Sequence, residues 1–177
     1  MKLKLLALIV AGTAMGAQFA HAADGLITFN GKLVAQTCII NGNGSGSKDF
    51  AVTLPPVSTS TLAKAGDSAG RTPFNIALTG CTPDSGTVHT YFEPGTTTDA
   101  ATGYLIVNGG ATNVQIRLLN DNFTEIKAGF ADASQNSKPA DIIGGSATLP
   151  YYAEYVATGA TGPGLANSSV MYTLAYQ

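Results

Sequence analysis

Charged side chains are scarce in this chain of 177 residues, which contains nine Lys and Arg against eleven Asp and Glu. Outside the first four residues there is no basic run, which argues against nucleic acid or an anionic membrane as a partner. Tryptophan is absent, and cysteine and histidine occur twice each. No apolar run reaches the length of a membrane-spanning helix. What remains is rich in Gly, Ala, Ser and Thr, which is typical of β-structure with many turns.

The first 22 residues have the pattern of a secretory signal peptide. Two lysines precede an apolar run over residues 5–10, and Ala20-His21-Ala22 matches a small-x-small cleavage site. We expect cleavage after Ala22, or one residue later after Ala23. The mature chain would then have 177 − 22 = 155 residues, the size of one domain, and seven basic against eleven acidic side chains, a net charge of 7 − 11 = −4.

Cys38 and Cys81 are the two cysteines of the chain. An exported chain meets an oxidising compartment, and an even number of cysteines favours pairing. We predict one intramolecular disulfide, which would stabilise the fold by about 4 kcal/mol in the chain-entropy model. Because no His or further Cys accompanies the pair, we expect no metal site and no cofactor.

Residues for an enzyme are few. After removal of the signal peptide His89 is the remaining histidine, and a lone histidine near a strand end is more often a surface or capped residue than a catalyst. Composition alone leaves a Ser-His-Asp arrangement open, but no Gly-x-Ser-x-Gly motif accompanies it. Residues 42–47 are glycine-rich but lack the Gly-Lys-Ser/Thr of a phosphate loop, so we read them as a hairpin loop. We expect no enzymatic activity.

Short segments with alternating apolar and polar residues recur along the chain, separated by Gly, Pro, Asn and Ser. Alternation places one set of side chains on one face of a strand. Many short strands with turns between them predict an all-β sandwich. We expect a short helical turn near 59–64, a turn at 120–122 and mostly loop over 129–145. The predicted strands are Phe50–Leu54, Pro73–Leu78, Thr87–Glu93, Tyr104–Val107, Val114–Leu119, Ala147–Ala157 and Val170–Gln177.

The stretch over residues 25–34 also alternates, at the start of the expected mature chain. Ile27, Phe29 and Leu33 share one face, and polar side chains occupy most of the other. Gly31 interrupts the apolar face, and a glycine inside a strand often marks close approach of another backbone. We predict that this strand joins the sheet of another molecule.

The order and spacing of these features resemble the pilins of the chaperone–usher pathway, closest to the major subunit of type 1-like fimbriae. Gly31 within its alternating segment resembles the donor strand of that family, and the two cysteines match its single disulfide. A glycine fourteen residues from the end and a penultimate tyrosine, here Gly164 and Tyr176, match its carboxy-terminal signature. Further similar segments are 111–119 and 150–159.

The resemblance implies an incomplete immunoglobulin-like sandwich that lacks its seventh strand and is completed by a donor strand from a neighbouring subunit. It implies a signal peptide over 1–22, a donor segment over 23–33 and a pilin domain over 34–177. The expected partners are identical or related pilin subunits, a periplasmic chaperone and the outer-membrane usher, and the expected location is a fimbrium on the cell surface. The donor residues would be Ile27, Phe29, Gly31 and Leu33, and the acceptor groove and chaperone contact would be Gly164, Val170, Tyr172, Leu174 and Tyr176.

Two alternatives remain open at the level of sequence. The first is a monomeric exported β-sandwich that binds a ligand, such as a carbohydrate on its tyrosine-rich strands. Its opening strand would pair within its own chain. The second is a minor or tip subunit of the same family.

Overall fold

The computed structural model describes residues 26–29, 33, 35 and 37–177. The chain divides into two units, residues 1–33 and 34–177, which are described separately. In the first unit the side chains of Leu26, Ile27, Phe29 and Leu33 are exposed, and 26–29 form no strand. Gly31 and the rest of the predicted opening strand lie outside the described residues.

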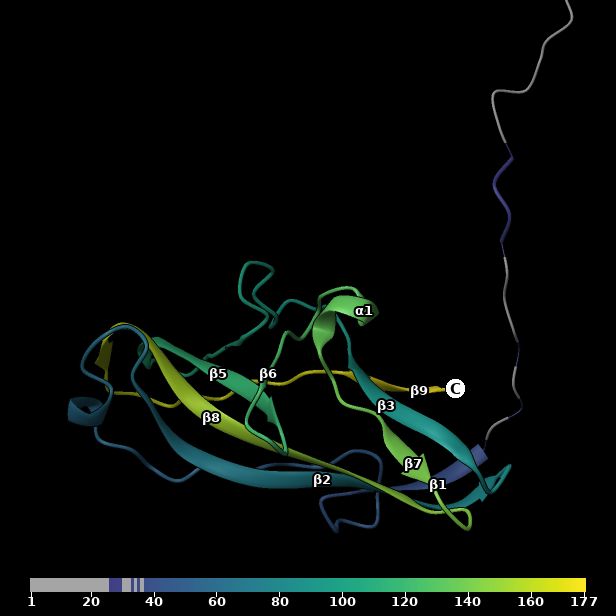
Figure 1. The fold of residues 1–177 in the computed structure, drawn as a ribbon. Coiled ribbons are helices and arrows are strands. Elements are labelled where there is room, and N and C mark those ends of the chain that lie inside the picture. Colours follow the sequence, from purple (N-terminus) through teal and green to yellow (C-terminus); the bar gives the residue numbers. More distant parts are fainter. Residues whose placement is uncertain (1–25, 30–32, 34, 36) are drawn as a thin grey trace, which may run out of the picture. The chain divides into compact units, whose positions relative to one another are not determined.

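The second unit contains two antiparallel sheets (Figure 1). Neighbouring strands of the larger sheet follow the order β1-β2-β8-β5-β4, and β6 also pairs with β5. Its long central strands are those whose alternating pattern is clearest in the sequence. The bounds are β1 (Thr37–Gly42), β2 (Ser68–Thr82), β4 (Leu105–Ile106), β5 (Thr112–Asn120), β6 (Glu125–Ile126) and β8 (Ala147–Gly162).

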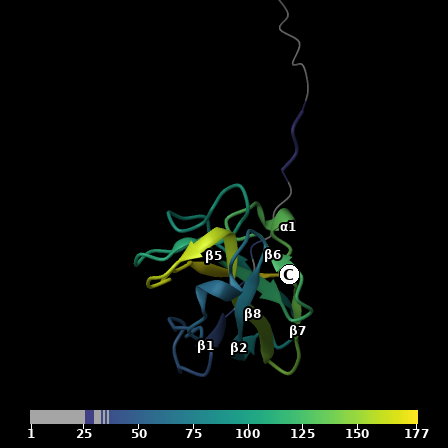
Figure 2. The same cartoon turned by 90° about the vertical axis from the view of Figure 1, so that its left-hand side faces the viewer.

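The smaller sheet consists of three strands in the order β7-β3-β9, with bounds β7 (Ala140–Ile142), β3 (Gly86–Phe92) and β9 (Tyr172–Tyr176). In the described part of the chain β9 pairs with β3 on one side and with no strand on the other. The carboxy terminus follows β9 directly and lies at the surface in both views (Figures 1 and 2). The last strand is therefore an edge strand.

The core lies between the two sheets and consists of the inward side chains that alternation predicts. Phe74, Ile76 and Leu78 on β2 are buried, as are Ile116 and Leu118 on β5. Tyr151 on β8 joins the layers, because its ring lies 5.5 Å from the rings of Phe74 and Phe92 and its hydroxyl donates to Thr90 Oγ1 at 2.9 Å. Burial raises the pKa of Tyr151. The predicted β-sandwich is confirmed.

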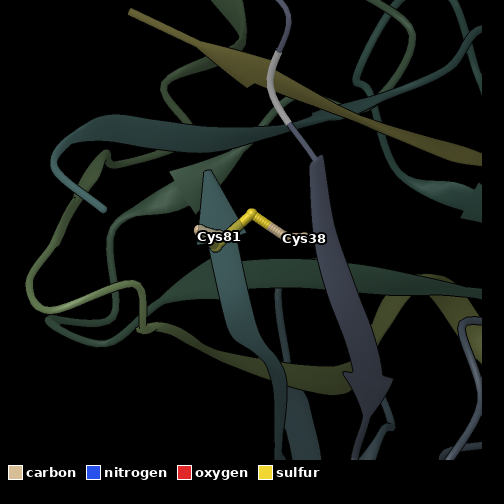
Figure 3. The surroundings of a disulfide bond; sticks show 2 residues. All are labelled: Cys38 and Cys81. Carbon is tan, nitrogen blue, oxygen red and sulfur yellow. A yellow bond between two sulfur atoms is a disulfide. The ribbon is translucent and has the colours of Figure 1, made fainter. Parts of the chain in front are cut away.

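Cys38 on β1 and Cys81 on β2 form a disulfide between these paired strands (Figure 3). The bond closes a loop with a sequence separation of 43 residues. The predicted disulfide is confirmed. It fastens the first strand, which lies at the edge of the larger sheet, to its neighbour.

The region 129–145 is mostly loop, as predicted, but it also contains the short elements α1 (Asp132–Gln135) and β7. The predicted turn at 120–122 begins one residue later, since Asn120 is the last residue of β5 and is buried. The helical turn near 59–64 is a 3-10 helix over Thr59–Thr61. None of the helices in the described ranges is both long and apolar enough to cross a membrane.

The predicted strand Phe50–Leu54 does not form. Its alternation is nevertheless real, because Phe50, Val52 and Leu54 are half-buried against the core while Ala51 and Thr53 are exposed. A strand needs a neighbour to pair with its backbone. Residues 51–56 make no backbone hydrogen bond to any other described residue. The segment has the side-chain pattern of a strand but lacks a partner.

Candidate functional site

An apolar groove of about 730 Å³ opens on the side of β9 that faces away from β3. One wall is the segment 48–54, which we call the 48–54 wall, and the other is β9 with the residues before it. Core side chains of the larger sheet form its floor. Those that line it include Phe74, Ile76, Ile116, Leu118 and Ala153.

The free edge of β9 presents unpaired backbone groups to this groove. Gln177 N donates to Thr87 O at 2.9 Å, Thr87 N donates to Gln177 O at 3.1 Å, and Glu93 N donates to Met171 O at 2.8 Å. Odd-numbered residues of this strand therefore bond to β3. Because antiparallel bonding alternates along a strand, the N–H and C=O groups of Tyr172, Leu174 and Tyr176 point away from β3.

Residues 51–54 of the 48–54 wall also have no backbone hydrogen bond to other described residues, so this part of the groove lies between two sets of free backbone groups. The same even-numbered residues of β9 place their side chains against the core. An extended chain in the groove would find hydrogen-bonding groups at its edges and an apolar surface beneath it. This is the arrangement required for β-strand addition, in which the main chain gives affinity and alternate side chains fill pockets.

The structure brings four of the five residues predicted for the acceptor groove together on one wall: Val170, Tyr172, Leu174 and Tyr176. Sequence reasoning missed the opposite wall, where Phe50, Val52 and Leu54 line the groove. Their alternation was visible in the sequence, but it was interpreted as an ordinary strand. An alternating segment that ends at Pro55-Pro56 could have indicated an edge without a partner.

One end of the groove is polar. Lys48 and Asp49 line it, and the hydroxyl of Tyr172 donates to the carbonyl oxygen of Lys48 at 2.7 Å. Burial, together with the nearby carboxylate of Asp49, raises the pKa of Tyr172. In the described part of the chain no group of three or more His, Cys, Asp and Glu side chains could hold a metal ion. The groove thus offers contacts to apolar side chains and to a backbone.

Comparison with known proteins gives the family. The family model described as type-1 fimbrial protein, A, matches residues 54–177. The chain belongs to the type-1 fimbrial protein family. It is 52% identical over 164 residues to the major fimbrial subunit SMF-1 of Stenotrophomonas maltophilia, covering 89% of this chain and 95% of that protein. It is 43% identical to the F17 fimbrial protein of Escherichia coli over 183 aligned positions, which cover 99% of each chain.

A solved structure of a chaperone–usher pilus has a similar fold. Its subunit superposes with a TM-score of 0.59 at 21% identity, covering 88% of this chain and 96% of that chain. This likeness shows the shared immunoglobulin-like fold of the fimbrial protein family.

Gly164, the fifth residue predicted for the groove of this fimbrial protein, is not among those that line it. A Cβ at this position would lie 2.2 Å from Ala111 N and 2.3 Å from the carbonyl carbon of Gly110. Gly164 therefore allows two backbone segments to approach each other closely, outside the groove. Its place in the carboxy-terminal signature reflects backbone packing.

His89 also lies outside the groove of the fimbrial protein. It occupies the middle of β3 and not the end, is buried, and its Nε2 lies 2.8 Å from Asp132 Oδ1 on α1. His89 is therefore not the surface residue that was one of the two predicted possibilities, and its contact with Asp132 fits the other, a capped residue. The His89–Asp132 pair joins α1 to the outer part of the smaller sheet.

Proposed function

We propose that this protein is a structural subunit of a bacterial fimbrium that polymerises head to tail by donor-strand exchange and supports cell adhesion. The amino-terminal segment 23–33 of one subunit enters the groove beside β9 of the next. The observation that carries the proposal is the groove itself, an apolar surface between two unpaired backbone edges. We assign it a structural and not an enzymatic role.

The amino-terminal segment has the complementary chemistry. Ile27, Phe29 and Leu33 are exposed apolar side chains in the single chain. Burying all three in a neighbour would contribute roughly 5–9 kcal/mol before the entropy of ordering, at about 1.5–3 kcal/mol for each side chain. The contact joins different surfaces of two copies, so it does not close on itself and a filament results.

An open groove also explains the expected route of export. An unpaired strand edge and an exposed apolar floor favour aggregation in solution. A periplasmic chaperone that inserts a strand would cover both, and the outer-membrane usher is the place where the next subunit replaces that strand. In this proposal residues 1–22 are the signal peptide and 34–177 are the pilin domain. The mature protein is located in a fimbrium on the cell surface.

The alternative of a monomeric binding module makes a different prediction. Such a module needs a closed sandwich, so the purified mature chain would be stable and monomeric without any partner. A minor or tip subunit of a fimbrium would share the groove and would differ in abundance along the filament. Immunogold labelling along isolated filaments separates a major subunit from a minor one.

The proposal is tested by electron microscopy of cells that lack the gene and are complemented with single variants. Phe29→Ser alters a side chain that would be buried in the neighbour, whereas Ile143→Ser alters another exposed apolar side chain, which does not line the groove. We expect filaments with the wild type and with Ile143→Ser, and few or none with Phe29→Ser. Normal filaments with Phe29→Ser, or a stable monomer in the periplasm of wild-type cells, would overturn the proposal.

A further inference from the structure

The 48–54 wall of the groove has little to hold it in place. Residues 51–56 make no backbone hydrogen bond to other described residues, and Asp49 N bonds within its own turn, to Ser47 Oγ. The ring of Phe50 lies against Gly42, where an added Cβ would be 1.9 Å from Phe50 Cδ1. The side chains of Phe50, Val52 and Leu54 pack against the core and are the main support of this segment on its own side of the groove.

A single hydrogen bond joins the two walls within the described part of the chain. It is donated by the hydroxyl of Tyr172, on β9, to the carbonyl oxygen of Lys48 at 2.7 Å. The Tyr172 ring also lies 6.2 Å from that of Phe50 in an edge-to-face arrangement. The side chain of Tyr172 packs against the core and reaches the opposite wall along the floor of the groove. The backbone edge of β9 remains unpaired, because the hydrogen bond is formed by the side chain.

We infer that the Tyr172–Lys48 hydrogen bond holds the 48–54 wall in position for an incoming strand, which makes Tyr172 a positioning residue for strand addition. The inference rests on the proposed function, because it concerns the same groove. If the 48–54 wall is already ordered before binding, no conformational entropy is lost to order it during binding. Association with the incoming strand is then more favourable. The backbone atoms of β9 that would pair with the incoming strand take no part in the Tyr172–Lys48 hydrogen bond.

Tyr172→Phe removes the hydroxyl and keeps the ring, and the neighbouring strand β3 offers a matched control. Tyr91 is half-buried and does not line the groove, and no hydrogen bond of its hydroxyl is present among the described residues. Tyr91→Phe therefore removes a hydroxyl of the same kind without affecting the wall or the groove. Both variants are made in the mature chain and refolded with the disulfide intact.

Limited trypsin digestion tests the Tyr172–Lys48 hydrogen bond. Trypsin cleaves at the carbonyl of lysine, and the carbonyl of Lys48 is the acceptor of the Tyr172 hydroxyl. Lys64 is an internal reference, because it is also exposed and its carbonyl accepts a bond from Asp67 N in a local turn at 3.1 Å. We expect Tyr172→Phe to raise cleavage after Lys48 relative to Lys64 by about 2- to 10-fold, the worth of one hydrogen bond. Tyr91→Phe leaves the ratio unchanged.

The role in strand addition is tested with a labelled synthetic peptide of residues 23–35 and each refolded chain, by fluorescence anisotropy. We expect Tyr172→Phe to lower the association rate constant by about 2- to 10-fold with little change in dissociation, and Tyr91→Phe to match the wild type. A variant that folds poorly alone is refolded with excess peptide, which stabilises the bound form. The bound peptide is then exchanged for unlabelled peptide before digestion, and the Lys48 to Lys64 cleavage ratio is read again.

The outcomes separate the two proposals. Failure of the wild type to bind the peptide overturns the proposed function. Peptide binding by the wild type, with an equal cleavage ratio or an equal association rate in Tyr172→Phe, overturns the positioning role of Tyr172 and leaves the proposed function standing.

Discussion

The side chain of Gln135 pairs with the backbone of Phe92 as a neighbouring strand would. Phe92 N donates to Gln135 Oε1 at 2.6 Å, and Gln135 Nε2 donates to Phe92 O at 2.9 Å. Gln135 belongs to α1 and is fully buried. Nearer the start of β3, Val88 is paired with Ala140 of β7. One amide side chain thus completes the edge of β3 that faces away from β9, while the edge of β9 remains open.

Gln135→Leu tests this role. The substitution keeps a side chain of similar size and leaves Phe92 N without its partner, at a cost of about 1–3 kcal/mol, while Phe92 O keeps the bond donated by Gly129 N at 2.9 Å. We expect the free energy of unfolding to fall by about 1–3 kcal/mol, measured by urea denaturation of the peptide-bound chain. Gln115→Leu is the control, because Gln115 is half-buried and bonds to Asp99 on the surface. Equal losses for the two variants would contradict the edge-pairing role.

Glu154 is a second buried polar residue that alternation alone could not place. Its carboxylate lies between two arginines, with Arg71 Nε 2.7 Å from Oε2 and Arg117 Nε 3.1 Å from Oε1. Burial by itself lowers the pKa of Arg117, but hydrogen bonds to Glu154, Tyr104 and Glu125 outweigh it and raise the pKa. Glu154 is only 1% exposed and bonds to both arginines, and Arg117 has a second acidic partner in Glu125.

We expect Glu154→Gln to destabilise the fold by about 1.5–3 kcal/mol, because it weakens buried hydrogen bonds between charged groups. Asp121→Asn removes one partner of an exposed pair, in which Lys138 Nζ lies 3.0 Å from Asp121 Oδ1, and should cost much less. Urea denaturation of both variants makes the comparison. A smaller loss for Glu154→Gln than for Asp121→Asn would show that the buried cluster contributes little.

The two long central strands and the groove-lining β9 could be predicted because their apolar residues alternate without interruption. Phe74, Ile76 and Leu78 on β2 and the even-numbered residues of β9 are examples. Alternation of apolar and polar residues indicates which face of a strand is buried, and it gives no other information. It could not place Gln135 or Glu154, since hydrogen bonds and ion pairs from distant parts of the chain account for their burial.

Two further differences, β7 and the segment Phe50–Leu54, have the same physical origin, and a third, at Gly164, does not. β7 has three residues, too few to show a period, so the region around it was predicted as loop. The segment Phe50–Leu54 alternates clearly, but pairing depends on a neighbour that alternation does not report. Gly164 was assigned to the groove by family signature, whereas the structure places it against Gly110 and Ala111.

Tyr176→Ala is expected to weaken capture of any strand in the groove. Tyr176 lies near the end of the apolar face of β9 and lines the groove. Loss of a buried aromatic side chain costs about 3–5 kcal/mol, and we expect the low end of that range because Tyr176 is half-buried in the open groove. Tyr91→Ala is the control, since Tyr91 is a half-buried tyrosine on β3 that does not line the groove. The measurement is the amount of chaperone that co-purifies with each variant, and equal recovery with Tyr176→Ala would contradict the assignment.

The prediction for Gly31 tests the register of the donor strand. Gly31 lies outside the described residues, but it shares its parity with Ile27, Phe29 and Leu33. In a strand these four residues face the same way, so in a neighbour's groove Gly31 would face the floor. Close-packed interiors have no spare room, and overpacking costs typically about 1–3 kcal/mol.

We therefore expect Gly31→Leu in the peptide of residues 23–35 to slow displacement of the chaperone from the wild-type complex by about tenfold or more. Asn30→Leu is the matched control, because it adds the same side chain one position away, on the opposite face. If Asn30→Leu slows displacement and Gly31→Leu does not, the register is shifted by one residue. If neither does, the segment does not enter the groove as a strand. A closed monomeric module predicts a third result, in which Gly31→Leu in the full chain lowers the stability of the monomer itself.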